Sequence, residues 1–75
     1  MEDNKFNSED IRLYTVKEVS KILHTNTTYV YDLIKAKKIP ALKLGSYKVR
    51  HSALVEFLTI NENNDLTNPY DIKPL

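Results

Sequence analysis

The stretch NTTYVYDLIKA, residues 26–36, decides how this chain folds. Val30, Leu33 and Ile34 stand at positions i, i+3 and i+4, so they share one face of a helix that can pack on a core. Asn26 comes just before this face and can cap the helix by accepting a backbone N–H. The pattern therefore predicts a short helix with a polar outward face, which consists of Thr27, Thr28, Tyr31, Asp32 and Lys35.

This outward face has two interpretations. Short hydroxyl side chains, a tyrosine and a lysine can contact the base edges and phosphates of a nucleic acid. An ordinary amphipathic helix with a solvated face has the same spacing, because helical periodicity mainly reports which residues are buried. The segments on either side of the stretch decide between the two.

A second helix is predicted before this stretch. Thr15 is followed three residues later by Glu18, which is the pattern of a capping box at a helix start. Four residues then recur at helical spacing and predict a helix that ends near residue 23: Val16, Val19, Ser20 and Leu23. The three residues 24–26 separate the two helical patterns, and this is the length of a helix-turn-helix elbow. His24 is suited to such a turn, because histidine tolerates positive φ better than β-branched residues do.

A β-hairpin is predicted after the stretch. Pro40 stops the helical pattern, and two alternating segments, 41–44 and 47–50, flank Gly45-Ser46. The alternation predicts three core-facing side chains: Leu42, Leu44 and Val49. It also predicts a cationic outer side, made of Lys43, Lys48 and Arg50.

A third helix and two chain ends complete the expected organisation. Ser52 can cap a helix in which Leu54, Phe57 and Leu58 form the apolar stripe. We expect one domain over residues 13–60. Residues 1–12 are polar and predict a flexible acidic segment. Residues 61–75 are rich in Asn and predict a tail that is flexible or becomes ordered on a partner through Leu66, Tyr70, Ile72 and Leu75.

Charge is distributed unevenly along the 75 residues, although the net charge is only +1. Residues 12–51 carry nine Lys and Arg against Glu18 and Asp32, a net of +7. Residues 1–11 and 52–75 each sum to −3. A basic middle between acidic ends indicates a polyanionic partner.

Several classes of protein do not fit this composition. The chain has no cysteine, and its two histidines have no other ligand type at metal-binding spacing, so we expect neither a disulfide framework nor a metal site. No nucleophile–base pattern or phosphate-binding glycine loop is present, so we expect no enzyme and no cofactor. No apolar run is long enough to span a bilayer, and the polar first residues do not read as a signal peptide. These features favour the cytoplasm.

Five segments carry a resemblance to a known family: YTVKEVSKIL (14–23), NTTYVYDLI (26–34), KIPALKLG (38–45), YKVR (47–50) and SALVEFL (52–58). Together they resemble the excisionase-family DNA-binding domain, which is related to the DNA-binding domain of MerR-type regulators. The resemblance covers about residues 13–58 and implies a mainly α fold with a β-hairpin wing, the winged helix-turn-helix. It also implies double-stranded DNA as partner, with residues 26–36 in the major groove and residues 42–50 on the backbone or minor groove.

The resemblance also implies which residues bind DNA. The helix contacts would be Thr27, Thr28, Tyr31 and Lys35, and the wing contacts would be Lys43, Ser46, Tyr47, Lys48 and Arg50. To these we add four further residues of the same surface: Asn26, Asp32, Lys37 and Lys38.

Three positions depart from the family pattern. Asp32 stands where the family usually has a basic residue, and it could accept a hydrogen bond from cytosine N4 or pair with Lys35. Lys37 replaces the usual glycine after the helix, which predicts a strained left-handed cap or a different geometry, and leaves Lys37 available for phosphate. The wing turn is also one residue shorter than usual, which brings Tyr47 near its tip.

The function that these features predict is an architectural DNA-binding protein, an excisionase or recombination directionality factor that acts with an integrase on a mobile element. A single module of this size makes a small footprint, so we expect copies to associate cooperatively on repeated sites. A small transcriptional regulator that uses the same surface at a promoter is an alternative. A protein-interaction module such as an antirepressor is an alternative of another class.

Overall fold

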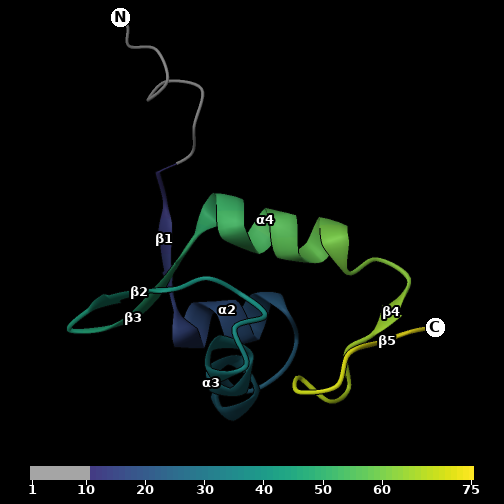
Figure 1. Ribbon diagram of the computed structural model, residues 1–75. Coiled ribbons are helices and arrows are strands. Elements are labelled where there is room, and N and C mark those ends of the chain that lie inside the picture. The colour runs from purple at the N-terminus through teal and green to yellow at the C-terminus, as the bar shows by residue number, and fades with distance from the viewer. Residues whose placement is uncertain (1–10) are drawn as a thin grey trace, which may run out of the picture.

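Three helices and two small antiparallel sheets make up residues 11–75, the part of the chain that this computed structural model describes. The elements are β1 (Leu13–Thr15), α2 (Val16–Ile22), α3 (Thr27–Lys35), β2 (Leu42–Leu44), β3 (Ser46–Arg50), α4 (His51–Ile60), β4 (Asn64–Asp65) and β5 (Lys73–Pro74). The β2–β3 hairpin and the β4–β5 pair lie at opposite ends, with the helices between them (Figure 1). The winged helix-turn-helix prediction is confirmed. The first ten residues of the expected flexible segment lie outside the described residues.

The core joins all three helices to the sheet. Its completely buried side chains come from α2, α3, the loop after α3, and β3: Val19, Val30, Leu33, Ile39 and Val49. Leu54 and Phe57 of α4 close the same cluster from the other side. Burial of these side chains is the main term that stabilises so small a domain.

Side-chain caps begin the first two helices as the sequence predicts. The Glu18 N–H donates to Thr15 Oγ1 at 3.1 Å, and the Thr15 N–H donates to Glu18 Oε1 at 2.8 Å. The Tyr29 N–H donates to Asn26 Oδ1 at 2.8 Å. Each bond satisfies a backbone donor that would otherwise lack a partner at a helix start.

Left-handed residues end both helices of the helix-turn-helix. His24 has φ 58° and Lys37 has φ 60°. Each helix end is closed by the two hydrogen bonds of a Schellman motif. The bond that spans five residues runs from the Thr25 N–H to the Ser20 C=O at 2.8 Å after α2. After α3 it runs from the Lys38 N–H to the Leu33 C=O at 2.9 Å. The left-handed geometry at Lys37 is therefore kept although glycine is absent.

The sheet contains a strand that the sequence does not predict. β1 pairs antiparallel with β3, so the strand order is β1-β3-β2. Thr15 is both the last residue of β1 and the cap of α2. The sheet and the helix-turn-helix thus share a residue and have no linker between them.

The wing has a different register from the expected one. Gly45 alone makes the turn at φ 75°, and Leu44 pairs with Ser46. A two-residue turn at Gly45-Ser46 would have paired Leu44 with Tyr47, and a shift by one residue moves every side chain of β2 to the other face of the sheet. The expectation that Leu42 and Leu44 face the core is therefore wrong, since they are 40% and 59% exposed. Lys43 instead shares a face with Tyr47.

The third helix also differs in two details. α4 begins at His51 with Arg50 as its N-cap, and no side chain caps it. The predicted cap, Ser52, lies inside the first turn, because β3 runs directly into the helix. Leu58, expected in the core, is 42% exposed.

Residues 61–75 fold back onto their own chain, which differs from the expected flexible or partner-ordered tail. β4 pairs with β5, the Leu75 N–H donates to the Asn63 C=O at 2.9 Å, and Pro69 is buried. Asp65 accepts from the Thr67 N–H at 2.9 Å, and Asn68 Oδ1 accepts from the Tyr70 N–H at 2.9 Å. The Asn and Asp residues that indicate disorder in the sequence here build turns through their own side chains. We call residues 61–75 the C-terminal hairpin.

Candidate nucleic-acid interface

The outward face of α3 presents a short polar stripe. Thr27, Thr28, Tyr31 and Lys35 are exposed, as the sequence predicts. Asn26 is exposed at the helix start, but its side-chain oxygen is occupied by the Tyr29 N–H. Asn26 therefore holds the start of the helix, and its amide N–H₂ and the second lone pair of its side-chain oxygen remain for an outside partner.

The wing meets α3 through two tyrosines. The rings of Tyr31 and Tyr47 lie 6.2 Å apart between centroids, at an interplanar angle of 65°. Lys43 Nζ lies 4.5 Å from the centroid of the Tyr47 ring. Edge-to-face ring pairs and cation–π contacts are favourable arrangements. The structure thus joins Tyr31, Tyr47 and Lys43 into one continuous surface.

Two shallow hollows extend this surface on either side of Tyr47. One, of about 220 Å³, lies between the start of α2, the start of α3 and the wing, and its polar lining is Thr15, Lys17, Thr27, Tyr31, Ser46 and Tyr47. The other includes Lys35 and Lys37. Lys17 was not among the predicted contacts. Its place as a basic residue inside the capping box Thr15–Glu18, at the start of the first helix of the pair, is the sequence signal that could have indicated it.

Lys48 and Arg50 lie on the other face of the wing. Their cross-strand partners are Leu42 and Leu13, so all four side chains face away from Val49 and the core. Lys48 Nζ still reaches the wing tip, where it lies 2.7 Å from Ser46 Oγ. Of the predicted wing residues, the structure brings Lys43, Ser46 and Tyr47 to α3, and leaves Arg50 apart from it.

Asp32 has a partner that sequence reasoning did not foresee. The Tyr70 hydroxyl donates to Asp32 Oδ1 at 2.9 Å, across 38 positions of sequence. This hydrogen bond, together with some desolvation and the negative charge of Asp32, raises the pKa of Tyr70 above its usual range. Between residues 11 and 75 no ion pair joins Asp32 to Lys35. Of the two partners expected for Asp32, the structure thus shows no pairing with Lys35.

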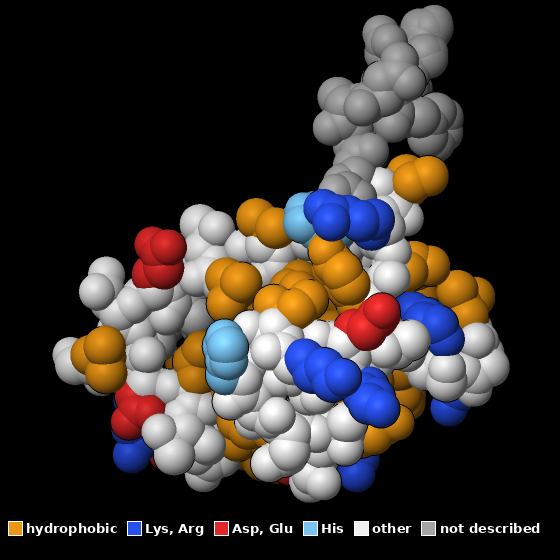
Figure 2. All heavy atoms as spheres, turned by 180° about the vertical axis from the view of Figure 1, so that it is seen from behind, with side chains coloured by type: hydrophobic (Ala, Val, Ile, Leu, Met, Phe, Trp, Pro, Cys, Tyr) orange, Lys and Arg blue, Asp and Glu red, His pale blue; other side chains and the backbone are white. Residues whose placement is uncertain are grey.

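Basic side chains gather toward the wing end of the molecule. The ion pair between Asp71 and Lys73, at 3.4 Å, is in the C-terminal hairpin, and none within the described residues engages the lysines of α3 or the wing. Lys37 and Lys38 are exposed at the end of α3. In Figure 2 most Lys and Arg side chains lie on the half of the surface away from the C-terminal hairpin, where an acidic side chain also lies among them, and other Asp and Glu side chains lie toward the opposite end. Cations without ion-pair partners are available to neutralise phosphates.

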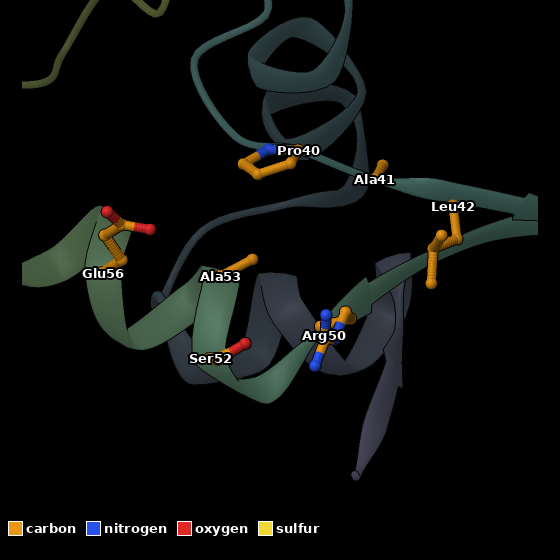
Figure 3. Close-up of a pocket in the computed structure, with 7 residues that line it drawn as sticks. All are labelled: Pro40, Ala41, Leu42, Arg50, Ser52, Ala53 and Glu56. Carbon is orange, nitrogen blue, oxygen red and sulfur yellow. The ribbon is translucent and has the colours of Figure 1, made fainter. Parts of the chain in front are cut away.

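A separate groove lies between the first turns of α4, the loop after α3 and the end of the wing next to α4. It measures about 240 Å³, and Pro40 and Ala53 face each other across it, with Arg50 and Glu56 at its ends (Figure 3). Among the described residues no three His, Asp or Glu side chains gather as metal ligands would. No helix in this part of the chain has the length and hydrophobicity needed to cross a membrane.

Comparison with known proteins identifies the family. The model of the family described as "Helix-turn-helix domain" matches residues 13–60, which is more than half of the chain and contains every predicted DNA contact. No curated protein and no solved structure gives a significant match. This family has a DNA-binding fold that is found in excisionase-like proteins, and the match supports sequence-specific DNA binding. The capped helix pair, the short turn between its helices, the adjoining hairpin and this match together show that the chain belongs to the helix-turn-helix domain family.

Proposed function

We propose that this protein is an architectural DNA-binding protein of the excisionase type, which acts with an integrase in the excision of a mobile element. The observation that carries the proposal is the continuous surface of α3 and the wing, in which the Tyr31 and Tyr47 rings are in contact. α3 would read base edges in the major groove, and the wing would follow the adjacent backbone or minor groove.

The charges of α3 and of the residues around it indicate which part provides affinity for DNA and which provides sequence preference. α3 carries Lys35 against Asp32, so the helix itself has no net charge to attract phosphate. Lys43 on the wing, Lys17 at the start of α2, and Lys37 and Lys38 after α3 supply the attraction. We therefore assign most of the affinity to the flanks of α3 and most of the sequence preference to α3.

The size of the module supports binding as several copies. A single domain of this kind buries roughly 600–1,000 Å² on DNA, which gives limited affinity by itself. Neighbouring copies on repeated sites would add contacts to each other and produce cooperative occupancy. The exposed Leu42 and Leu44 on the outer face of the wing are available for such contacts, or for contact with an integrase.

The experiment has two stages. Sites are first selected from random duplexes with the whole protein, and binding is measured by fluorescence anisotropy at several salt concentrations and by footprinting. An excision assay then combines the protein with the integrase encoded nearest to its gene and with that integrase's attachment sites. We expect selected sites within the attachment region, steep salt dependence and stimulated excision.

Matched variants link these results to the surface. Thr28→Ala and Tyr31→Ala should change the selected sequence, whereas Lys35→Ala should weaken binding to all sequences. Sites confined to promoters, with no effect on excision, would indicate a transcriptional regulator instead. Wild-type protein that binds no DNA but captures a protein partner would contradict the proposal altogether.

A further inference from the structure

The C-terminal hairpin holds one tyrosine against the outward face of α3. Two hydrogen bonds join the hairpin to the helix: the Tyr29 hydroxyl donates to the Leu66 C=O, and the Tyr70 hydroxyl donates to Asp32 Oδ1. Tyr29 and Asp32 are three residues apart, so both lie on the same side of α3. The wing contacts α3 through Tyr31, and Figure 1 shows the wing and the C-terminal hairpin at opposite ends of the molecule. α3 is therefore held from both sides.

Asp32 occupies a central place on the polar stripe. Thr28 precedes it by four residues and Lys35 follows it by three, so the three side chains are neighbours on the outward face. A carboxylate here repels phosphate unless a donor from the DNA reaches it, and the N4 amino group of cytosine is such a donor in the major groove. Each carboxylate has about four acceptor sites, and Tyr70 uses only one of them.

Burial does not explain why Tyr70 lies where it does. The residue is 56% exposed, so its ring adds little to the core. Its backbone is fixed instead: Asn68 accepts from the Tyr70 N–H at 2.9 Å and from the Asp71 N–H at 3.0 Å, and the Pro69 between them is buried. An exposed tyrosine on a fixed turn, with its hydroxyl directed at a carboxylate, restricts the orientation of that carboxylate.

We propose that Tyr70 is a positioning residue, which fixes the Asp32 carboxylate so that it accepts a hydrogen bond from the N4 amino group of one cytosine. The C-terminal hairpin would thus help to set the sequence preference of α3, although it lies outside the segment that the family model matches. This inference rests on the proposed DNA binding by α3. The Tyr70 hydroxyl is protonated at neutral pH, as tyrosine ordinarily is, and so can donate to Asp32 there.

The test compares base preference rather than affinity alone. Sites are selected with the wild-type protein, and anisotropy titrations then measure every single-base variant of the best site. Asp32→Ala, which removes the acceptor, should reduce the preference for cytosine at one base pair, and Tyr70→Phe should reduce it at the same base pair by about fivefold or more, since a good base contact gives roughly 1–3 kcal/mol of discrimination. The double variant should lose no more of this preference than Asp32→Ala alone, because both changes act on the same interaction.

Tyr29→Phe is the matched control. It removes the other hydrogen bond between the hairpin and α3, keeps the ring, and leaves the hydrogen bond from Tyr70 to Asp32 in place. We expect its base preferences to stay within about twofold of wild type at every position, since no base contact worth 1–3 kcal/mol is lost. Thermal unfolding of all variants verifies that each is folded at the temperature of the titrations.

Three outcomes would overturn the inference. Tyr70→Phe could keep the wild-type preference while Asp32→Ala loses it, which would show that Asp32 needs no positioning. Tyr29→Phe could change the preference at the same base pair as strongly, which would show that the effect of Tyr70 comes from the packing of the C-terminal hairpin and not from its hydrogen bond to Asp32. Wild-type protein could select no sequence at all, which would overturn the proposed function together with the inference, whereas the first two outcomes leave the proposed function intact.

Discussion

The Tyr31 ring contacts the Tyr47 ring edge to face, with 6.2 Å between their centroids, and this pair joins the exposed side of α3 to the wing. Tyr47 lies on the same face of β3 as the buried Val49, and the single-residue turn at Gly45 brings Lys43 of β2 to that face, beside the Tyr47 ring. A hairpin with the longer turn would have placed Lys43 on the opposite face of the sheet.

The first prediction concerns Tyr47. Tyr47→Ala should lower the free energy of unfolding by about 1–2 kcal/mol, because it removes an aromatic pair, a cation–π contact and part-buried apolar area. Tyr47→Phe keeps the ring, so it should change this free energy by less than about 0.5 kcal/mol. Urea denaturation followed by circular dichroism measures both. Equal losses in the two variants would show that the hydroxyl, and not the ring, makes the contact.

The second prediction concerns Lys43. If Lys43 contacts a phosphate, Lys43→Ala should weaken binding to every DNA sequence and reduce the slope of log K against log salt by about 0.9. Lys73→Ala is the matched control, because this lysine lies in the C-terminal hairpin and pairs with Asp71. Its slope should match wild type. Anisotropy titrations over a range of salt concentrations give both slopes. An unchanged slope for Lys43→Ala would show that Lys43 does not contact a phosphate.

The third prediction separates stability from affinity at Lys37. Lys37 has φ 60°, a conformation that glycine adopts without steric cost. Lys37→Gly should therefore raise the free energy of unfolding by roughly 0.5–1 kcal/mol, and it should also weaken DNA binding because a cation is lost. Lys38→Gly, at the next position, provides the comparison, since Lys38 is not left-handed. A Lys37→Gly variant that is less stable than wild type would contradict the strain argument.

The fourth prediction concerns alkaline pH. Burial, and to a lesser extent the charge of Asp65, raises the pKa of Tyr29, while the hydrogen bond to Asp32 chiefly raises the pKa of Tyr70. A raised pKa in the folded state means that these hydroxyls contribute stability below pH 10.0, their ordinary pKa, and that this contribution is lost as the pH rises through the folded-state values.

Tyrosinate absorbance during a pH titration measures this effect. In the wild type, two of the five tyrosines should ionise only above pH 10.0, the ordinary tyrosine pKa, and each should add a late component to the titration curve. Tyr29→Phe and Tyr70→Phe should each remove one late component, and each should make unfolding less sensitive to pH above 10.0. A titration curve that keeps both late components in Tyr70→Phe would show that Tyr70 is not the group concerned.

Local signals explain which parts of the fold could be predicted from the sequence. The capping residues Thr15 and Asn26 act within three residues of themselves, so both helix starts were confirmed. The predicted core residues of α3, Val30 and Leu33, are buried for the same reason, since helical spacing depends only on neighbours in the chain.

The parts that the sequence did not predict depend on distant partners or on one residue of register. Leu13 pairs with Arg50, which no pattern in a three-residue strand could indicate. Gly45 makes the turn alone, and this single difference reverses the face of Leu44. The C-terminal hairpin needs the Tyr29 hydroxyl for one of its anchors, so its own composition of Asn and Pro could not distinguish turns from disorder.

Thr15 belongs to both β1 and the capping box of α2, and Tyr31 of α3 contacts Tyr47 of the wing, so the helix-turn-helix and the three-stranded sheet are connected at both of these points. The distance and angle between the two elements are fixed before any duplex arrives. A straight duplex whose grooves do not match this spacing has to deform to contact both, and the energy of that deformation depends on the flexibility of its base steps. Base pairs that the protein never contacts would then contribute to the choice of site.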